Sequence, residues 1–269
     1  MCTADKWDSP RFLAFFVALS FFRLTSRVSA RPPEGNASRW ALAFGLVTKR
    51  ILASMKTYIQ LSSVHRYPLP AIFQEDDVRY AESLVEYFLE QYTHKGDVVF
   101  DPFAGFGTTL FVAERMGRVS YGVEINQDRV NFARRKLTNP EHLIHGDARF
   151  LAKVDLPEID FSMTSPPYMT KDNHPEFPFA GYQITGEGYE EYLRDIRSIY
   201  EQLRARMKPT GTVVLEVANL KPEKQVTTLA WDVGQEISKV LRFEGEVIVC
   251  WDECGYGYDH TYCLIFSVP

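Results

Sequence analysis

The sequence predicts an α/β protein in which a mostly parallel sheet of seven strands is covered by helices on both faces. From residue 76 onward, short apolar runs alternate with segments of helical periodicity. Helices between successive strands imply crossover connections and therefore parallel neighbours. The last two expected strands have no helix between them, which implies an antiparallel hairpin at one edge of the sheet.

The expected elements follow the apolar pattern along the chain. Aspartate caps a helix and complements its dipole, so Asp76 and Asp77 suit the start of the first helix. We expect helices at 76–91, 108–116, 128–137, 189–207 and 227–241. We expect strands at 98–100, 119–125, 143–145, 160–163, 213–217, 247–251 and 262–268.

Length and composition exclude several classes of protein. The 269 residues are enough for a buried core. The composition, with 45% apolar and 24% charged residues, excludes a disordered or fibrous chain. No apolar run reaches the roughly 18 residues of a membrane-spanning helix, so we expect no membrane partner. The four cysteines do not follow a zinc-binding pattern, so we expect no metal site.

The first 54 residues differ from the rest in charge. They hold 8 Lys and Arg against 3 Asp and Glu, whereas residues 55–269 hold 22 against 32. The apolar run 13–22 ahead of Val28-Ser29-Ala30 resembles a signal peptide, and the Arg- and Ser-rich stretch 23–54 resembles a transit peptide. We favour a third interpretation, in which Met55 is the true start and 1–54 form a poorly defined extension. The acidic body argues against a broad, non-specific nucleic-acid surface.

A glycine-rich turn, residues 101–110, follows the first expected strand and opens a helix. Gly105 and Gly107 allow a ligand to approach the backbone closely. The turn lacks both the third glycine of a dinucleotide-binding loop and the Gly-Lys of a phosphate-binding loop. The carboxylate of Asp101 in this turn suits a cationic ligand group. Glu124 ends the next strand, where it can accept from ribose hydroxyls. Asp147 ends the strand after that, where it can accept from an adenine amino group. The three acids predict a nucleoside ligand with a charged amino-acid tail.

The sequence Thr164-Ser165-Pro166-Pro167-Tyr168 follows the fourth expected strand. Two prolines fix the backbone and remove two donors, and the residue before each is held extended. The Ser165 hydroxyl and the Pro166 carbonyl therefore form a rigid ledge lined by acceptors, with the aromatic face of Tyr168 beside it. Such a ledge suits a planar amine.

These motifs resemble those of the S-adenosylmethionine-dependent amino-methyltransferases of nucleic acids. The resemblance covers about residues 65–269 and rests on 101–110, 123–126 and 164–168, in one of the family's permuted orders. It implies a Rossmann-like class I methyltransferase fold with an antiparallel last strand, a catalytic domain at 55–269, and S-adenosylmethionine as cofactor. The implied cofactor-binding residues are Phe73, Asp101, Phe103, Gly105, Gly107, Thr108, Glu124, Ile125, Asp147 and Ala148. The implied catalytic residues are Ser165, Pro166, Pro167 and Tyr168.

The resemblance implies a DNA methyltransferase that modifies an exocyclic amine of a flipped base by direct transfer. Ser-Pro-Pro-Tyr is most typical of the cytosine-N4 branch, so cytosine N4 is favoured over adenine N6. An RNA guanine-N2 methyltransferase and a non-catalytic cofactor-binding protein of the same fold are the alternatives. The connections are too short for the recognition domain of many restriction-modification methylases. The sequence specificity is therefore open, and RNA stays possible as the substrate. The aromatic segment 177–182 is expected either to stack on bases or to cover the domain. We expect a cytoplasmic, nucleoid-associated protein; the sequence does not indicate its oligomeric state.

Overall fold

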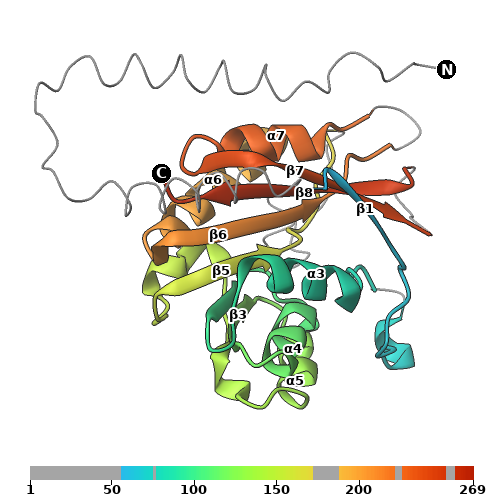
Figure 1. Ribbon diagram of the computed structural model, residues 1–269, viewed down its shortest axis with the longest axis vertical. Helices are drawn as coiled ribbons and strands as arrows, with labels where there is room; N and C mark the ends of the chain where they lie inside the picture. Colours follow the sequence, from blue (N-terminus) through green and yellow to red (C-terminus); the bar gives the residue numbers. More distant parts are fainter. Residues whose placement is uncertain (1–55, 75–76, 172–187, 222–225, 253–257) are drawn as a thin grey trace, which may run out of the picture. The chain divides into compact units, whose positions relative to one another are not determined.

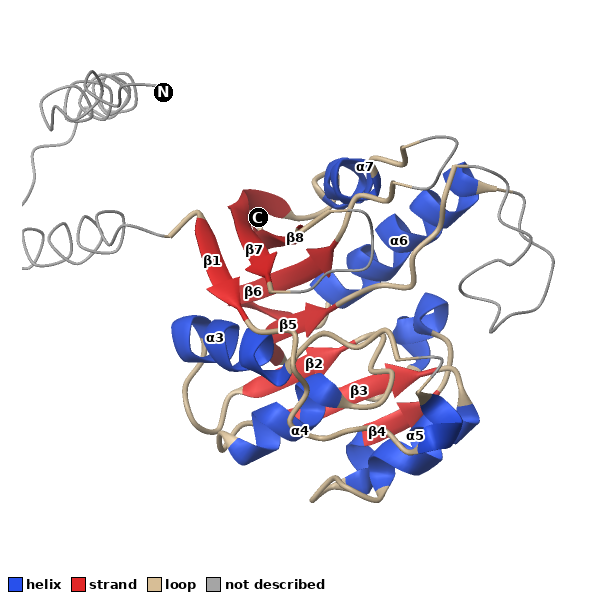
Figure 2. Ribbon diagram, turned by 90° about the vertical axis from the view of Figure 1, so that its right-hand side faces the viewer, coloured by secondary structure: helices blue, strands red, loops and turns tan. Residues whose placement is uncertain are grey.

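The structure, a computed structural model, describes residues 56–74, 77–171, 188–221, 226–252 and 258–269. Within these residues one sheet is flanked by helices on both faces (Figures 1 and 2). The expected N-terminal extension 1–54, Asp76 and the aromatic segment 177–182 lie outside the described residues. The division into an extension and a catalytic domain therefore stays a prediction.

The sheet has eight strands in the order β1-β7-β8-β6-β5-β2-β3-β4. Strand β8 runs antiparallel to both of its neighbours, and every other neighbouring pair is parallel. The strands are β1 (Tyr58–Leu61), β2 (Val98–Asp101), β3 (Val119–Glu124), β4 (Leu143–His145), β5 (Ile159–Thr164), β6 (Met207–Val217), β7 (Arg242–Trp251) and β8 (His260–Ser267). The helices are α3 (Glu82–Tyr92), α4 (Thr108–Arg115), α5 (Gln127–Arg134), α6 (Tyr189–Arg204) and α7 (Leu229–Ile237), with 3-10 turns η1 (Ala71–Phe73), η2 (Pro140–His142) and η3 (Ala148–Lys153).

The predicted α/β architecture with an antiparallel last strand is confirmed, but the predicted number of strands is wrong. All seven expected strands are present as β2 to β8, and the eighth is β1, which pairs in parallel with β7. Because β1 has only four residues, its own periodicity gives little signal. Strand β1 is held in place by pairing with the otherwise open edge of β7. The β7–β8 hairpin therefore does not form the edge of the sheet.

The first helix begins later than expected. Asp77 was expected in its first turn, yet α3 starts at Glu82. The Asp77 carboxylate instead accepts hydrogen bonds from Arg79, with Oδ1 2.7 Å from Nε and 3.3 Å from the backbone nitrogen. The acid therefore fixes a turn ahead of the helix rather than its N-terminus, because a neighbouring guanidinium competes with the helix amides.

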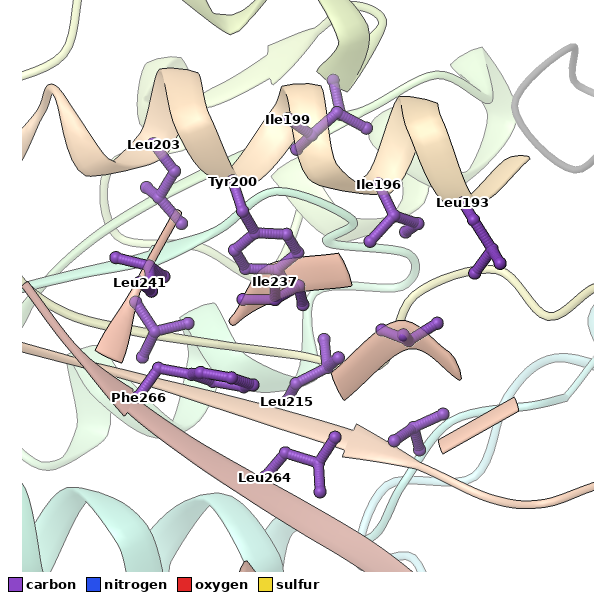
Figure 3. Packing of buried hydrophobic residues seen from close by; sticks show 14 of the residues in the cluster. Leu193, Ile196, Ile199, Tyr200, Leu203, Leu215, Ile237, Leu241, Leu264 and Phe266 are labelled. Atoms are coloured by element: carbon purple, nitrogen blue, oxygen red, sulfur yellow. The ribbon is translucent and has the colours of Figure 1, made fainter. Parts of the chain in front are cut away.

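Two cores cover the two faces of the sheet. On one face Ile196, Tyr200 and Leu203, spaced at three and four residues along α6, pack against strand residues such as Leu215 and Phe266 (Figure 3). On the other face α3 and α4 pack against β2, β5 and β6. Central strands of a sheet covered on both faces are expected to be apolar throughout. An acid within such a strand therefore needs an explanation.

The chain changes direction across the sheet between β2 and β5. From β2 the sheet grows through β3 to β4, whereas from β5 it grows through β6 toward β7. In open α/β sheets, ligands bind in the crevice at the carboxyl ends of the strands where this reversal occurs. Both sequence motifs, 101–110 and 164–168, start at these two strand ends.

Candidate active site

The glycine turn holds its backbone in conformations that favour glycine. Gly105 has φ 54° and Gly107 has φ 85°. A Cβ on Gly107 would lie 2.9 Å from a ring carbon of Phe111 and 3.1 Å from Cβ of Ala133. Thr108 is buried as the first residue of α4. The turn therefore packs tightly on α4 and α5 at Gly107, where a side chain would force its neighbours to move.

Glu124, at the end of β3, connects the glycine turn to the next loop. Its Oε2 accepts from the Gly105 nitrogen at 2.8 Å, and its Oε1 accepts from the Asn126 nitrogen at 2.7 Å. Each carboxylate oxygen has more than one acceptor position, so each can accept one further hydroxyl. Ile125 follows with 36% of its surface exposed. A carboxylate beside an exposed apolar side chain fits a ribose and its base.

Asp147, at the end of β4, is paired with an arginine within the chain. Its carboxylate accepts from the Arg149 backbone nitrogen at 2.9 Å and from the Arg149 Nη2 at 2.7 Å. The same guanidinium lies 3.7 Å from Asp195. Ala148 is buried directly beside the carboxylate. An adenine amino group would share Asp147 with Arg149 rather than meet an unpaired acid.

Asp101 lies buried at the end of β2, beneath the glycine turn. Its Oδ1 accepts from the Phe103 nitrogen at 2.9 Å, and its Oδ2 lies 3.3 Å from the Tyr80 hydroxyl. The Thr109 and Thr164 hydroxyls also approach it. Burial raises the pKa of Asp101 to about 6, against the opposing effect of these hydrogen bonds. The half-buried Phe103 side chain packs against the α6 core.

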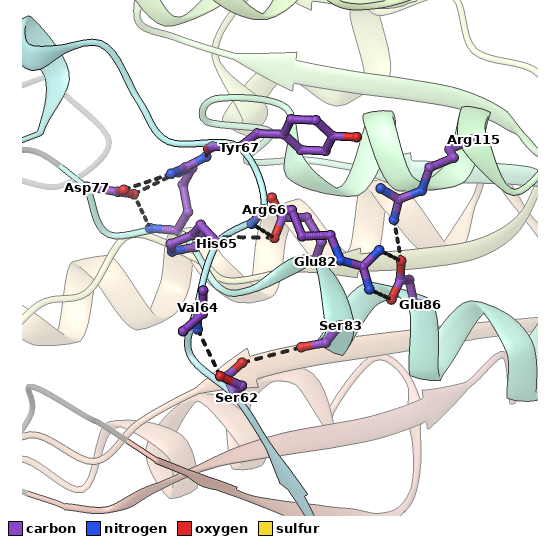
Figure 4. Close-up of polar contacts among 11 residues, drawn as sticks. Ser62, Val64, His65, Arg66, Tyr67, Asp77, Glu82, Ser83, Glu86 and Arg115 are labelled. Atoms are coloured by element: carbon purple, nitrogen blue, oxygen red, sulfur yellow. Dashed lines mark hydrogen bonds and ion pairs between the residues drawn. The ribbon is translucent and has the colours of Figure 1, made fainter.

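The segment ahead of η1 is fastened to α3. The Arg66 guanidinium donates to both oxygens of Glu86, at 2.6 and 2.9 Å, and the Arg66 nitrogen donates to Glu82 (Figure 4). Arg115 of α4 donates to Glu86 as well. These contacts hold the segment between β1 and η1 against α3.

Phe73 ends this segment in an aromatic cluster. Its ring centroid lies 5.2 Å from that of Phe106 in the glycine turn and 5.6 Å from that of Phe132 on α5. The tilted contact with Phe106 and the edge-on contact with Phe132 fix the ring between the glycine turn and α5. A contact between Phe73 and the methionine end of the cofactor stays a prediction.

The Ser-Pro-Pro-Tyr loop leaves the end of β5 with a fixed tyrosine. Pro166 is buried, while Ser165, Pro167 and Tyr168 are partly exposed. The Tyr168 hydroxyl donates to Glu216 Oε2 at 3.3 Å and accepts from the Ala218 nitrogen at 3.0 Å. The Ser165 Oγ lies 3.5 Å from the same hydroxyl. The orientation of the ring is therefore set from β6.

Glu216 is the site residue that the sequence motifs missed. It lies 5% exposed on β6; the Tyr168 hydroxyl donates to its carboxylate, and the Ser165 and Thr261 hydroxyls approach the same group. Thr261 in turn accepts from the Trp251 indole nitrogen at 3.0 Å. Burial raises the pKa of Glu216, whereas the hydroxyls lower it. The available signal was an acid inside the apolar run 213–217, where an unpaired charge is costly.

The structure brings the two motifs together at one place. Strands β2 and β5 are parallel neighbours, so Thr164 at the end of β5 lies beside Asp101 at the end of β2. Gly105 and Glu124 are in contact, as are Ser165 and Tyr168. The group of residues that suits a cation and a nucleoside thus adjoins a ledge that suits an amine.

The fold is that of the S-adenosylmethionine-dependent, Rossmann-like methyltransferases. One similar solved structure is TrmN from Thermus thermophilus, with a TM-score of 0.53 and 17% identity over 73% of this chain and 52% of that chain. A family model described as DNA methylase matches residues 65–135.

Curated relatives match over short stretches. A Type II methyltransferase, M.BglII of Bacillus subtilis, is 38% identical over 22% of this chain and 18% of its own length. The DNA adenine methyltransferase YhdJ of Escherichia coli (strain K12) is 38% identical over 27% of this chain and 24% of its own length. These matches confirm the resemblance to the DNA amino-methyltransferase family and support S-adenosylmethionine as the cofactor. The chain spans about a quarter or less of the length of each of these two relatives.

Two further features concern only the described part of the chain. Within it, no helix is both long and apolar enough to cross a membrane. Within the same residues, no group of three or more His, Cys, Asp or Glu side chains could hold a metal ion.

Proposed function

We propose that this chain is an S-adenosylmethionine-dependent methyltransferase that modifies an exocyclic amine in DNA, with cytosine N4 favoured over adenine N6. The observation that carries the proposal is the parallel pairing of β2 with β5, which places the carboxyl ends of the two strands side by side. It joins the strand end that opens the glycine turn to the strand end that opens the acceptor-lined ledge. A methyl donor and an amine bound there would be neighbours.

The residues at the ends of β2 and β3 fit this cofactor. Glu124 keeps acceptor positions for ribose hydroxyls, and Ile125 offers apolar surface to a base. The buried carboxylate of Asp101 suits the ammonium group of the amino-acid tail, which would replace the solvent that burial removes. When bound, S-adenosylmethionine supplies a methyl group activated by a sulfonium.

The ledge supplies orientation and electrostatic stabilisation. The Ser165 hydroxyl and the Pro166 carbonyl would accept the two N–H groups of the amine in a fixed geometry, which favours a pyramidal nitrogen and offsets developing positive charge. The Tyr168 ring, fixed through Glu216 and Ala218, would stack on the base. In a duplex the base has to leave the helical stack to reach this loop.

Ser165 is what favours cytosine N4, since the resemblance places serine at this position in that branch. The similarity to an adenine methyltransferase supports adenine N6 as the second candidate. Both candidates use the same ledge and differ only in the base that it receives.

The test is a transfer assay with the full chain and S-adenosylmethionine labelled in the methyl group. Unmethylated duplex DNA, single-stranded DNA and total RNA are offered separately, digested to nucleosides, and the labelled nucleoside is identified by mass. We expect labelled N4-methylcytosine; N6-methyladenine would keep the enzyme class and correct the base. Label found only in RNA guanine would overturn the DNA assignment. Cofactor binding without label in any nucleic acid would contradict nucleic-acid methylation.

A further inference from the structure

A buried acid lies next to the amine ledge and is not among the residues that we propose to hold the cofactor. Glu216 is 5% exposed, and its Oε2 accepts from the Tyr168 hydroxyl at 3.3 Å. The Ser165 Oγ lies 3.5 Å from that hydroxyl, and the Ser165 and Thr261 hydroxyls approach the carboxylate. The first two hydroxyls belong to the loop after β5, and the third belongs to β8. Three separate hydroxyls around one buried carboxylate form a defined site rather than an incidental contact.

We propose that Glu216 accepts the proton that the amine loses on methylation, with the Ser165 hydroxyl as the relay. This inference rests on the proposed function. In the transfer one N–C bond forms and one S–C bond breaks, which leaves a thioether and an amine with one excess proton. Ser165 Oγ takes that proton from the nitrogen and passes its own to Glu216. The products are a neutral methylated amine and a neutral carboxylic acid, which later returns the proton to solvent.

The hydrogen-bond partners of Glu216 suit both of its protonation states. A hydroxyl can donate to a carboxylate and can also accept from a carboxylic acid after a rotation. The Tyr168 hydroxyl accepts from the Ala218 nitrogen, so it stays a donor to Oε2. The Ser165 and Thr261 hydroxyls are the ones that can reverse. Protonation therefore leaves the carboxyl group hydrogen-bonded in its buried position.

The other titratable groups around Glu216 do not compete for this proton. Cys263 is its cross-strand partner on β8, and Tyr80 faces it from the segment ahead of α3. Burial raises the pKa of the Cys263 thiol and of the Tyr80 hydroxyl well above their ordinary values, so both stay neutral near pH 7. Asp101, which also approaches Tyr80, lies on the cofactor side of the site. Among these described groups, Glu216 is the acid that adjoins the ledge.

The principal test is Glu216→Gln in the full chain, measured as single-turnover transfer at saturating S-adenosylmethionine over about pH 5 to 9, the range in which a buried carboxyl titrates. The wild-type rate is expected to fall at low pH, where Glu216 is already protonated. The amide keeps hydrogen bonds to the hydroxyls but cannot take a proton. We expect the variant to be slower by about 10²-fold and to lack this fall at low pH.

A second variant separates proton transfer from a structural role. Thr261→Val removes one hydrogen bond that favours the ionised carboxylate, so it should raise the pKa of Glu216 and move the low-pH fall to higher pH. Infrared difference spectroscopy gives a readout other than activity, because the carboxylic-acid band of Glu216 should move with the profile and vanish in Glu216→Gln. Glu114→Gln is the matched control: Glu114 accepts from the Thr138 and Asn139 nitrogens away from the ledge, so the pH profile should not change.

The outcomes distinguish the two proposals. Wild-type protein that binds S-adenosylmethionine but labels no nucleic-acid amine would overturn the proposed function. Wild-type transfer with an unchanged rate and pH profile in Glu216→Gln would overturn only the role of Glu216. If Glu216→Gln does not fold, Thr261→Val decides. A Thr261→Val variant whose pH profile and infrared band are the same as those of the wild type would contradict the relay.

Discussion

The cofactor half and the acceptor half of the site are each organised around one buried carboxylate, but the two acids are held differently. Asp101 receives a backbone N–H from Phe103 as well as side-chain hydroxyls. Glu216 is hydrogen-bonded by side-chain hydroxyls. A backbone N–H can only donate, so it favours the ionised form, whereas hydroxyls accommodate either form.

The difference matches the two chemical tasks that we propose. An acid that pairs with the ammonium of a cofactor has to be ionised when the cofactor is bound. An acid that collects a proton has to be stable in both states. The surrounding donors, rather than burial alone, therefore separate two carboxyl groups that burial shifts in the same direction.

The sharpest way to break this comparison is Ser165→Ala. Loss of the hydroxyl removes an acceptor for the amine and the link to Glu216, so single-turnover transfer should fall about 10²- to 10³-fold. Cofactor affinity should stay the same, because Ser165 contacts only the acceptor half. Ser162→Ala is the control: its buried hydroxyl has no hydrogen-bond partner among the described residues, and its loss should leave transfer intact. Equal losses in both variants would show a structural effect of β5.

The packing of the cofactor half gives the next largest effect. Gly107→Ala places a Cβ 2.9 Å from Phe111 at φ 85°, so we expect the free energy of unfolding to fall by about 2–4 kcal/mol. Gly96→Ala tests the backbone term alone, since Gly96 has φ 89° but nothing within 4 Å of its added Cβ. It should cost about 1 kcal/mol. Urea denaturation of both variants measures the difference, and equal losses would rule out the steric clash.

The pH dependence of cofactor binding sharpens the assignment of Asp101. The pKa of Asp101 is raised to about 6 by burial, so below that pH its proton has to leave before an ammonium can pair with it. The dissociation constant for S-adenosylmethionine should be constant above about pH 7 and rise about tenfold per unit well below pH 6. Titration calorimetry at several pH values measures this. In Asp101→Asn, binding should be weak and without that dependence; an unchanged profile would remove Asp101 from the cofactor site.

The smallest effect concerns stability without ligand. The folded-state pKa of Asp101 lies above its ordinary value of 3.8, so the unfolded chain releases this proton first. The contribution of Asp101 to stability is therefore fully present below about pH 4 and is lost as pH rises through about 6. Asp101→Asn should be more stable than wild type at pH 7, by about 1–3 kcal/mol. Thermal unfolding at pH 4 and pH 7 checks the sign; a gain that is larger at pH 4 would contradict it.

The two halves also differ in how far the sequence could predict them. The cofactor half is encoded in contiguous stretches, so the contact between Gly105 and Glu124 follows from a glycine turn and a strand-end acid. The acceptor half combines Ser165 with Glu216 and Thr261 from strands that carry no motif. Their meeting depends on the register of β6 against β8, which local patterns do not specify.

Two other differences have local causes. The short strand β1 forms only because β7 offers an open edge, and the four residues themselves indicate little. Arg149, two residues after Asp147, pairs with its carboxylate, a contact that the position of the acid at a strand end did not predict. Both outcomes were set by partners whose position the sequence pattern alone could not supply.

The most direct test of the division into two halves is calorimetric titration of S-adenosylmethionine into Ser165→Ala and Asp101→Asn at pH 7.5, a pH chosen to lie above the pKa of about 6 of Asp101. We predict that Ser165→Ala binds the cofactor as tightly as the wild type does, although it transfers the methyl group much more slowly. Asp101→Asn should bind it at least about tenfold more weakly, the loss of one charge-assisted contact. Loss of cofactor binding in Ser165→Ala to the same extent as in Asp101→Asn would contradict the separation.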